Sequence, residues 1–218
     1  MFRDRIDAAT QLADHLMYIK TEDLVVLAIP RGGLPIGSVV AKTLGAPLDV
    51  VLTKKIGHPF HKEYAIGALS LENTILTDAI GIPKEYIAEE TAHIREILKQ
   101  RHRQYYKHRF PENLRDKTII IVDDGVATGN TLMVTIALVK KQNPRKIVVA
   151  IPVAPPSAIR LLKATPDVDE LICLQIPENF HAVGQFYEEF QQVSDEEAIK
   201  LLEETNTKKY PIGDTNGS

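Results

Sequence analysis

Positions 119–131 read Ile119-Ile120-Ile121-Val122-Asp123-Asp124-Gly125-Val126-Ala127-Thr128-Gly129-Asn130-Thr131. The apolar beginning predicts a strand buried on both faces, and the acids would then lie at its carboxyl end, where open α/β sheets bind ligands. Gly125 and Gly129 favour a turn that opens a helix, expected from about Gly129 to Lys141. Backbone N–H groups and threonine hydroxyls at the start of such a helix can cradle an anion.

Two acids beside an anion cradle suit a sugar phosphate. Carboxylates accept hydrogen bonds from vicinal hydroxyls while amides hold the phosphate, and such charge-assisted bonds contribute ~1.5–3 kcal/mol each. A plainer interpretation is an acidic turn that caps the helix, but a cap needs only one acid. The sequence therefore favours a sugar-phosphate site.

The rest of the chain alternates between strand and helix patterns. Strands are expected at 24–29, 48–53, 118–122, 146–151 and 170–174. Helices are expected at 4–19, 35–44, 156–164 and 195–203, the last capped by Ser194 or Asp195. Apolar strands that alternate with helices predict an α/β fold with a central, mostly parallel sheet flanked by helices.

Residues 1–205 are expected to form this domain, with two excursions. The alternation breaks at about 70–115, where a hairpin over 66–77 and a long helix after Pro83 predict an insertion or flap. Residues 175–193 predict a small C-terminal hood. The polar tail 206–218 is expected to be disordered.

Residues 119–131 resemble, over all thirteen positions, the phosphoribosyl pyrophosphate signature of the type I phosphoribosyltransferase family. The resemblance implies transfer of ribose 5-phosphate from phosphoribosyl pyrophosphate to a nitrogen nucleophile such as a nucleobase, with Mg²⁺ assisting the release of pyrophosphate. It implies that Asp123 and Asp124 bind the ribose hydroxyls and reach Mg²⁺, held mainly by the substrate, through water. The 5-phosphate would be bound by Ala127, Thr128, Gly129, Asn130 and Thr131.

Ala127 bears on the subclass. Hypoxanthine-guanine-type members carry a third acid at this position as the proposed base catalyst, whereas adenine-, uracil- and orotate-type members have alanine. Because this chain has Ala127, it lacks an acidic base catalyst at this position. The resemblance then disfavours a six-oxopurine acceptor.

Ile29-Pro30-Arg31-Gly32-Gly33 resembles the pyrophosphate loop of the same family. Glycines let backbone amides approach a pyrophosphate closely. The resemblance implies a non-proline cis peptide between Pro30 and Arg31, and it implies pyrophosphate binding by Pro30, Arg31, Gly32, Gly33, Lys54 and Lys55. Arg31 and Lys54 would join the two acids as catalytic residues. A β-turn with a solvated arginine is the alternative.

Residues 54–65 are polar and aperiodic and predict a loop, similar to the flexible loop that closes over substrate in the family. Lys54, Lys55 and Lys62 could neutralise pyrophosphate. We reject a metal site made by His58, His61 and Glu63, because a loop would not fix tetrahedral geometry. Solvated side chains are the favoured interpretation of these three residues.

The hood contains four aromatic residues within eleven positions. The family resemblance implies a nucleobase pocket here, formed by Phe180, Val183, Phe186 or Tyr187. Packing of the same side chains onto the core is an equal alternative.

Basic residues also gather on the long helix: Arg95, Lys99, Arg101, Arg103, Lys107 and Arg109. They could form a nucleic-acid face, which would suit a non-catalytic module that senses phosphoribosyl pyrophosphate or nucleotides and could bind RNA. A solvated face, or cations supplied to a phosphate-rich cleft, is favoured, so nucleic acid is not an expected partner. A phosphosugar hydrolase ranks last, because no nucleophile pair is recognisable.

Composition is that of a globular protein, with 44% hydrophobic and 25% charged residues, and the net charge of −3 argues against a polyanion partner. The single cysteine, Cys173, lies in an apolar run and is expected to be a core residue. No apolar run reaches the ~18 residues of a membrane span, and residues 1–5 do not resemble a signal peptide, so a cytoplasmic location is expected. The resemblance implies a homodimer. Motifs along nearly the whole chain also resemble a bacterial phosphoribosyltransferase subgroup with no assigned substrate.

Overall fold

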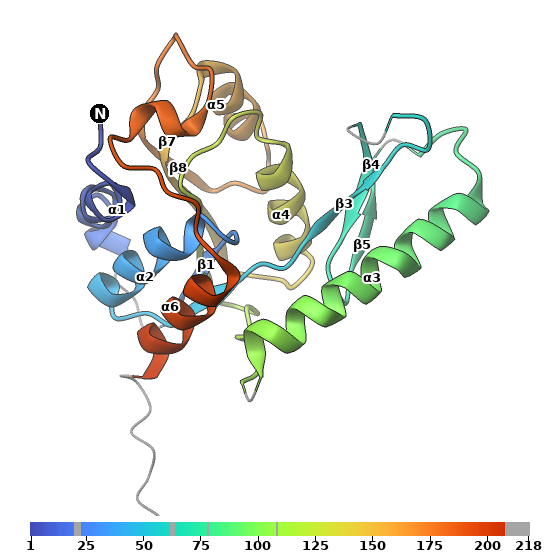
Figure 1. Cartoon of the computed structure of the whole chain (residues 1–218), viewed down its shortest axis with the longest axis horizontal. Coiled ribbons are helices and arrows are strands. Elements are labelled where there is room, and N and C mark those ends of the chain that lie inside the picture. The colour runs from blue at the N-terminus through green and yellow to red at the C-terminus, as the bar shows by residue number, and fades with distance from the viewer. Residues whose placement is uncertain (20–22, 62–63, 78, 108, 208–218) are drawn as a thin grey trace, which may run out of the picture.

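The computed structural model describes residues 1–19, 23–61, 64–77, 79–107 and 109–207. Its central sheet contains β1 (Leu24–Ala28), β2 (Leu48–Val50), β6 (Thr118–Val122), β7 (Lys146–Val153) and β8 (Glu170–Gln175). The strand order is β2-β1-β6-β7-β8, and every neighbouring pair is parallel. The expected α/β architecture is thereby confirmed (Figure 1).

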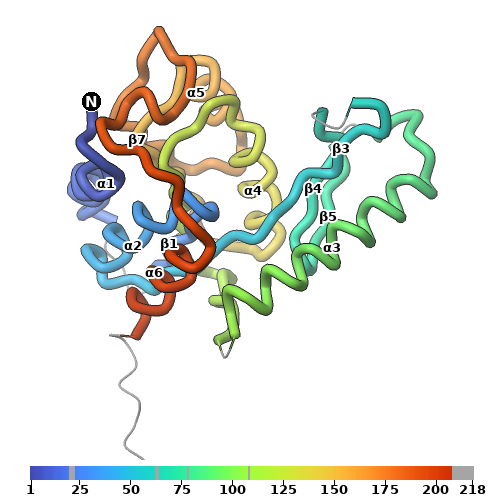
Figure 2. Tube along the Cα trace, in the orientation of Figure 1, coloured from blue at the N-terminus to red at the C-terminus, as the bar shows by residue number. Residues whose placement is uncertain are grey.

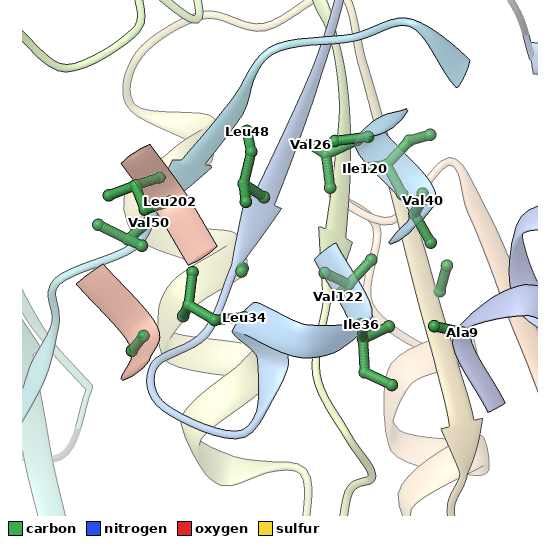
Figure 3. Packing of buried hydrophobic residues seen from close by; sticks show 14 of the residues in the cluster. Ala9, Val26, Leu34, Ile36, Val40, Leu48, Val50, Ile120, Val122 and Leu202 are labelled. Atoms are coloured by element: carbon green, nitrogen blue, oxygen red, sulfur yellow. The ribbon is translucent and has the colours of Figure 1, made fainter. Parts of the chain in front are cut away.

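Helices cover both faces of this sheet, so its strands are mostly apolar. One face packs against α1 (Arg5–Asp14), α2 (Gly33–Leu44) and α6 (Asp195–Thr207), as Figure 3 shows for Val26 and Ile120 beside Val40. The other face packs against α4 (Asn130–Lys140) and α5 (Pro156–Lys163). Successive residues of β1 and β6 belong to opposite cores, so that every residue of both strands is buried.

The insertion is larger than the sequence predicted. It contains a second, antiparallel sheet of β3 (Lys54–Gly57), β4 (Ala65–Leu69) and β5 (Thr74–Leu76), and α3 (Lys84–Tyr106) lies across it. The hairpin over 66–77 is confirmed, but the prediction of a loop from Lys54 was wrong for 54–57. That segment buries only Ile56 and Gly57, and it becomes a strand because it pairs with β4. In Figure 1 the insertion projects away from the central sheet.

The far end of α3 is fastened to the core by two adjacent tyrosines. The Tyr106 hydroxyl donates to Asp49 Oδ1 at 2.7 Å, and the Tyr105 hydroxyl donates to Asp195 Oδ1 at 2.8 Å. The insertion is therefore held where the last turn of α3 meets the domain. At its other end, α3 begins after Pro83, which is its N-cap.

The C-terminal helix continues past the predicted boundary at residue 205. Asn206 is buried, and its side chain donates to the Leu48 carbonyl at 2.8 Å and accepts from the Leu48 N–H at 3.1 Å. The expectation of disorder from residue 206 was therefore wrong for 206–207, because Asn206 satisfies the backbone of β2. The remainder of the predicted tail, 208–218, lies outside the described residues. Ser194 caps the helix by accepting from the Glu197 N–H at 3.1 Å.

Short 3-10 turns at η1 (Met17–Ile19) and η2 (Val183–Phe186) complete the elements. None of the helices in the described part of the chain combines the length and apolar character needed to cross a membrane.

Candidate functional site

The turn between β6 and α4 forms a small hollow at the carboxyl edge of the central sheet. Gly129 has a left-handed backbone with φ 84°, which allows the chain to turn directly into α4. The hollow measures about 150 Å³ and is lined by Asp123, Gly125, Val126, Ala127, Thr128, Gly129, Thr131 and Leu132. The first N–H groups of α4 have no partner within the helix, so the hollow offers donors to an anion.

Asp123 lines this hollow and is the more deeply buried of the two acids. Its Oδ1 accepts from the Asp124 N–H at 2.9 Å. Burial raises the pKa of Asp123 well above its ordinary value, and the neighbouring charge of Asp124 raises it further. A carboxyl group in this environment takes up a proton readily unless a ligand or cation offsets its charge.

Asp124 lies outside the hollow and is held by the N-terminal segment. Arg5 donates from Nε to Asp124 Oδ2 at 2.8 Å, its Nη2 lies 2.8 Å from the same oxygen, and the two side chains are only 12% and 13% exposed. Burial raises the pKa of Asp124, whereas Arg5 lowers it. We expected both acids to be open to a ligand; instead, one oxygen of Asp124 is already occupied by an ion pair with Arg5.

The pyrophosphate-loop motif follows β1 and faces the same acids. The Pro30–Arg31 peptide is cis, as the family resemblance implied. A β-carbon at Gly33 would lie 2.8 Å from the Val122 carbonyl, so only glycine lets the two loops approach this closely. The Arg31 guanidinium lies 4.0 Å from the carboxylate of Asp195.

Lys54 and Lys55, at the start of the insertion, face the first residues of α4 across a second hollow of about 490 Å³. It is lined by Thr53, Lys54, Lys55, Ala65, Thr128, Asn130, Thr131 and Val134. Both lysine side chains are exposed. The structure therefore brings these two cations to the residues proposed for the 5-phosphate.

The remaining residues of the predicted loop lie farther along the insertion. The rings of His58 and His61 stack at 5.7 Å, and His58 also contacts Phe60 and Tyr64. Lys62 and Glu63 lie outside the described residues. Within the described ranges, no three histidine, cysteine or carboxylate side chains gather into a group that could hold a metal ion.

The donor set does suit a metal carried by a substrate. Mg²⁺ commonly binds one or two carboxylates together with phosphate oxygens, keeping several waters. Asp123 and Asp124 could supply such carboxylates beside an anion cradle. The residues thus fit a phosphate-bound cation reached through water.

The hood packs together with the N-terminal segment (Figure 2). The Phe2 N–H donates to the Phe186 carbonyl at 2.8 Å, and the Phe2 carbonyl accepts from the Glu188 N–H at 2.9 Å. Tyr187 is only 5% exposed, and its hydroxyl donates to the Asp124 carbonyl at 2.5 Å. Its ring lies 5.4 Å from Phe2 and 5.0 Å from Phe190, an arrangement that favours core packing over base stacking for Tyr187.

Another hood residue, Val183, lies against the turn that follows β6. A β-carbon at Gly125 would lie 2.5 Å from a methyl group of Val183, so Val183 covers the acidic turn directly. Phe180 and Phe186 stack at 5.2 Å and are partly buried. Val183 thus lies against the acidic turn, while Phe180 and Phe186 pack against the core.

Sequence reasoning missed the contribution of Arg5. Its only signal was its place in the N-terminal Phe2-Arg3-Asp4-Arg5 motif. No sequence pattern indicated that Asp195 would lie between Arg31 and Tyr105.

Comparison with known proteins agrees with this geometry. The model of the phosphoribosyl transferase domain matches residues 3–191. A Mycobacterium tuberculosis protein named "Putative phosphoribosyl transferase MT0597" is 35% identical over 208 residues, which cover 93% of this chain and 46% of that protein. The chain therefore spans about half the length of the curated relatives that it matches along most of its own length.

Two further relatives cover different shares of the chain. The crystal structure of TT1426 from Thermus thermophilus is 37% identical, with a TM-score of 0.85, and the match covers 93% of this chain and 98% of that one. A uracil phosphoribosyltransferase of Mycoplasma genitalium is 44% identical over 66 residues, 30% of this chain and 32% of that protein. The signature turn, the fold and these similarities together show that the chain belongs to the phosphoribosyltransferase family.

Proposed function

We propose that this chain transfers ribose 5-phosphate from phosphoribosyl pyrophosphate to a ring nitrogen of a nucleobase, with release of pyrophosphate. One observation carries the proposal: the acidic turn and the pyrophosphate-loop motif meet at one edge of the sheet, where Gly32 contacts Asp124. A diol-binding pair, an anion cradle and a cation-bearing glycine loop are thereby joined. A phosphorylated ribose that carries a second phosphate group needs all three.

Each group of residues would bind a different part of the substrate. The cradle of residues 127–131 would hold the 5-phosphate, and Asp123 and Asp124 would accept hydrogen bonds from the ribose hydroxyls. The loop of residues 30–33 would hold the pyrophosphate, with Lys54 and Lys55 approaching from the insertion. This division orients C1′ toward the acceptor.

The chemical step forms a bond from the acceptor nitrogen to C1′ and breaks the bond from C1′ to the pyrophosphate oxygen. Positive charge develops on the ribose ring, and the carboxylates of Asp123 and Asp124 offset it. Arg31, Lys54 and Lys55 offset the charge that passes to the leaving pyrophosphate. When bound to the pyrophosphate oxygens, Mg²⁺ supplies further charge neutralisation.

A nucleobase acceptor is supported by the local similarity to a uracil phosphoribosyltransferase and by the hood. Val183 lies against the acidic turn, and the stacked pair Phe180 and Phe186 belongs to the same hood segment, so the hood could offer apolar surface to a flat ring. Such a reaction would return free bases to nucleotides.

The test measures pyrophosphate release from phosphoribosyl pyrophosphate and Mg²⁺ with individual nucleobases. Wild type should release pyrophosphate with at least one base, and Asp124→Asn should lower turnover strongly. Asp14→Asn is the matched control, because Asp14 is exposed at the end of α1.

Two outcomes would contradict the proposal. Tight binding of phosphoribosyl pyrophosphate without release in the presence of any base would favour the alternative of a non-catalytic sensor. Failure of wild type to bind phosphoribosyl pyrophosphate would remove both functions.

A further inference from the structure

Arg5 brings the N-terminal segment into the candidate site. Its Nε and Nη2 atoms both lie 2.8 Å from Oδ2 of Asp124, and its Nη1 donates to the Gln191 carbonyl at 2.7 Å. The guanidinium carbon lies 3.9 Å from the centre of the Phe190 ring. One side chain therefore joins α1, the hood and the acidic turn.

The backbone around Arg5 is fixed as firmly as its side chain. Phe2 is fully buried, and the segment forms hydrogen bonds with Phe186, Glu188 and Glu189 of the hood. Moving Arg5 away would expose the ring face of Phe190 and leave the nearly buried carboxylate of Asp124 without its cation, which is costly. The ion pair is thus expected to persist when a ligand binds.

The geometry of the ion pair divides the two oxygens of Asp124. Both guanidinium contacts go to Oδ2. Oδ1 is therefore the oxygen that Arg5 leaves for a hydroxyl group. We propose that Arg5 is a positioning residue of the ribose site: it occupies one oxygen of Asp124 and orients the other toward a ribose hydroxyl. This inference rests on the proposed function.

The positioning role predicts an effect on binding that is separate from any effect on stability. Without Arg5 the carboxylate of Asp124 loses the contact that fixes its orientation, so binding of phosphoribosyl pyrophosphate to the folded protein should weaken. A purely structural role for Arg5 would lower the melting temperature and leave the affinity of the folded protein unchanged.

The experiment measures the Kd of phosphoribosyl pyrophosphate by calorimetry, together with the melting temperature of each variant. Arg5→Gln should weaken binding on the order of tenfold or more, because a charge-assisted contact is lost. Arg5→Lys keeps the charge without the planar fork, so it should recover only part of the lost affinity. Arg3→Gln is the matched control, because the Arg3 side chain is exposed and pairs with Asp4 at the surface.

The melting temperatures separate the two roles of Arg5. Equal binding in Arg5→Gln and Arg3→Gln, or a loss of affinity no larger than the unfolded fraction of Arg5→Gln explains, would overturn the role of Arg5 while leaving the proposed function intact. Absence of binding in wild type would overturn the proposed function itself, and the inference with it.

Discussion

Gly32 and Asp124 are so close that a β-carbon at position 32 would lie 2.1 Å from Oδ2 of the carboxylate. No side chain can occupy that space without displacing Asp124 from Arg5. The two loops that carry the candidate site therefore approach each other too closely at Gly32 for any other residue, as they do at Gly33.

Replacing this glycine should damage the site more than the fold. Gly32→Ala should raise the KM for phosphoribosyl pyrophosphate on the order of tenfold, because the carboxylate must move from its hydrogen-bonded position. Steady-state kinetics with thermal melting would separate the two effects. Gly45→Ala is the control: its φ of 67° makes alanine cost about 1 kcal/mol of stability, yet no atom of the described residues lies within 4 Å of the added methyl group. Equal kinetic losses in both variants would contradict the account.

The two lysines at the start of the insertion should contribute to substrate binding through charge. Lys54→Ala with Lys55→Ala should raise the KM for phosphoribosyl pyrophosphate, and the difference from wild type should diminish as salt is added, since exposed charges are screened. Lys163→Ala, an exposed lysine on α5, should have no such effect. An unchanged KM in the double variant would remove these residues from the pyrophosphate site.

The hood should act on the acceptor rather than on the sugar phosphate. Phe186→Leu should raise the KM for the acceptor base while leaving that for phosphoribosyl pyrophosphate unchanged, because Phe186 stacks on Phe180 in the hood segment that carries Val183. Phe110→Leu is the control, since that side chain is 88% exposed. A loss of stability with no change in either KM would show that these aromatic residues only pack the core.

The attachment of the insertion should depend on pH. Asp49 is buried, and burial raises its pKa, while the hydrogen bond from Tyr106 lowers it. Tyr106→Phe removes that bond, so the carboxylate form of Asp49 becomes less favourable in the folded state. We expect a loss of about 1–3 kcal/mol of unfolding free energy near neutral pH, and a smaller loss in acid, where Asp49 is protonated.

Urea unfolding at several pH values would measure this loss. Tyr18→Phe is the control, because Tyr18 is 66% exposed and its hydroxyl bonds the partly exposed residue Glu170. A loss for Tyr106→Phe that is the same in acid and at neutral pH would contradict the assigned role of Asp49.

Sequence patterns predicted the elements whose position is determined by the burial of their own apolar residues. Continuous apolar runs such as β1 and β6 have to be covered on both faces, so the parallel sheet and its helices follow. The strand β3 escaped prediction because it buries only two residues, and its structure depends on pairing with β4. Its local composition is that of a loop.

The candidate site also has a part that the sequence predicts and a part that it does not. The cradle of residues 127–131 and the glycine loop are local motifs, so they could be read directly from the sequence. The contact from Arg5 to Asp124 spans 119 positions and depends on how the N-terminal segment packs against the hood. The place of Arg5 in the N-terminal Phe2-Arg3-Asp4-Arg5 segment does not say which residue it contacts.

A co-crystal structure with phosphoribosyl pyrophosphate and Mg²⁺ tests the central claim most directly. The account predicts the 5-phosphate in the hollow lined by residues 127–131, with ribose hydroxyls within hydrogen-bonding distance of Asp123 and of Asp124 Oδ1. A ligand bound elsewhere, with that hollow empty and Asp124 bonded to Arg5 alone, would contradict it.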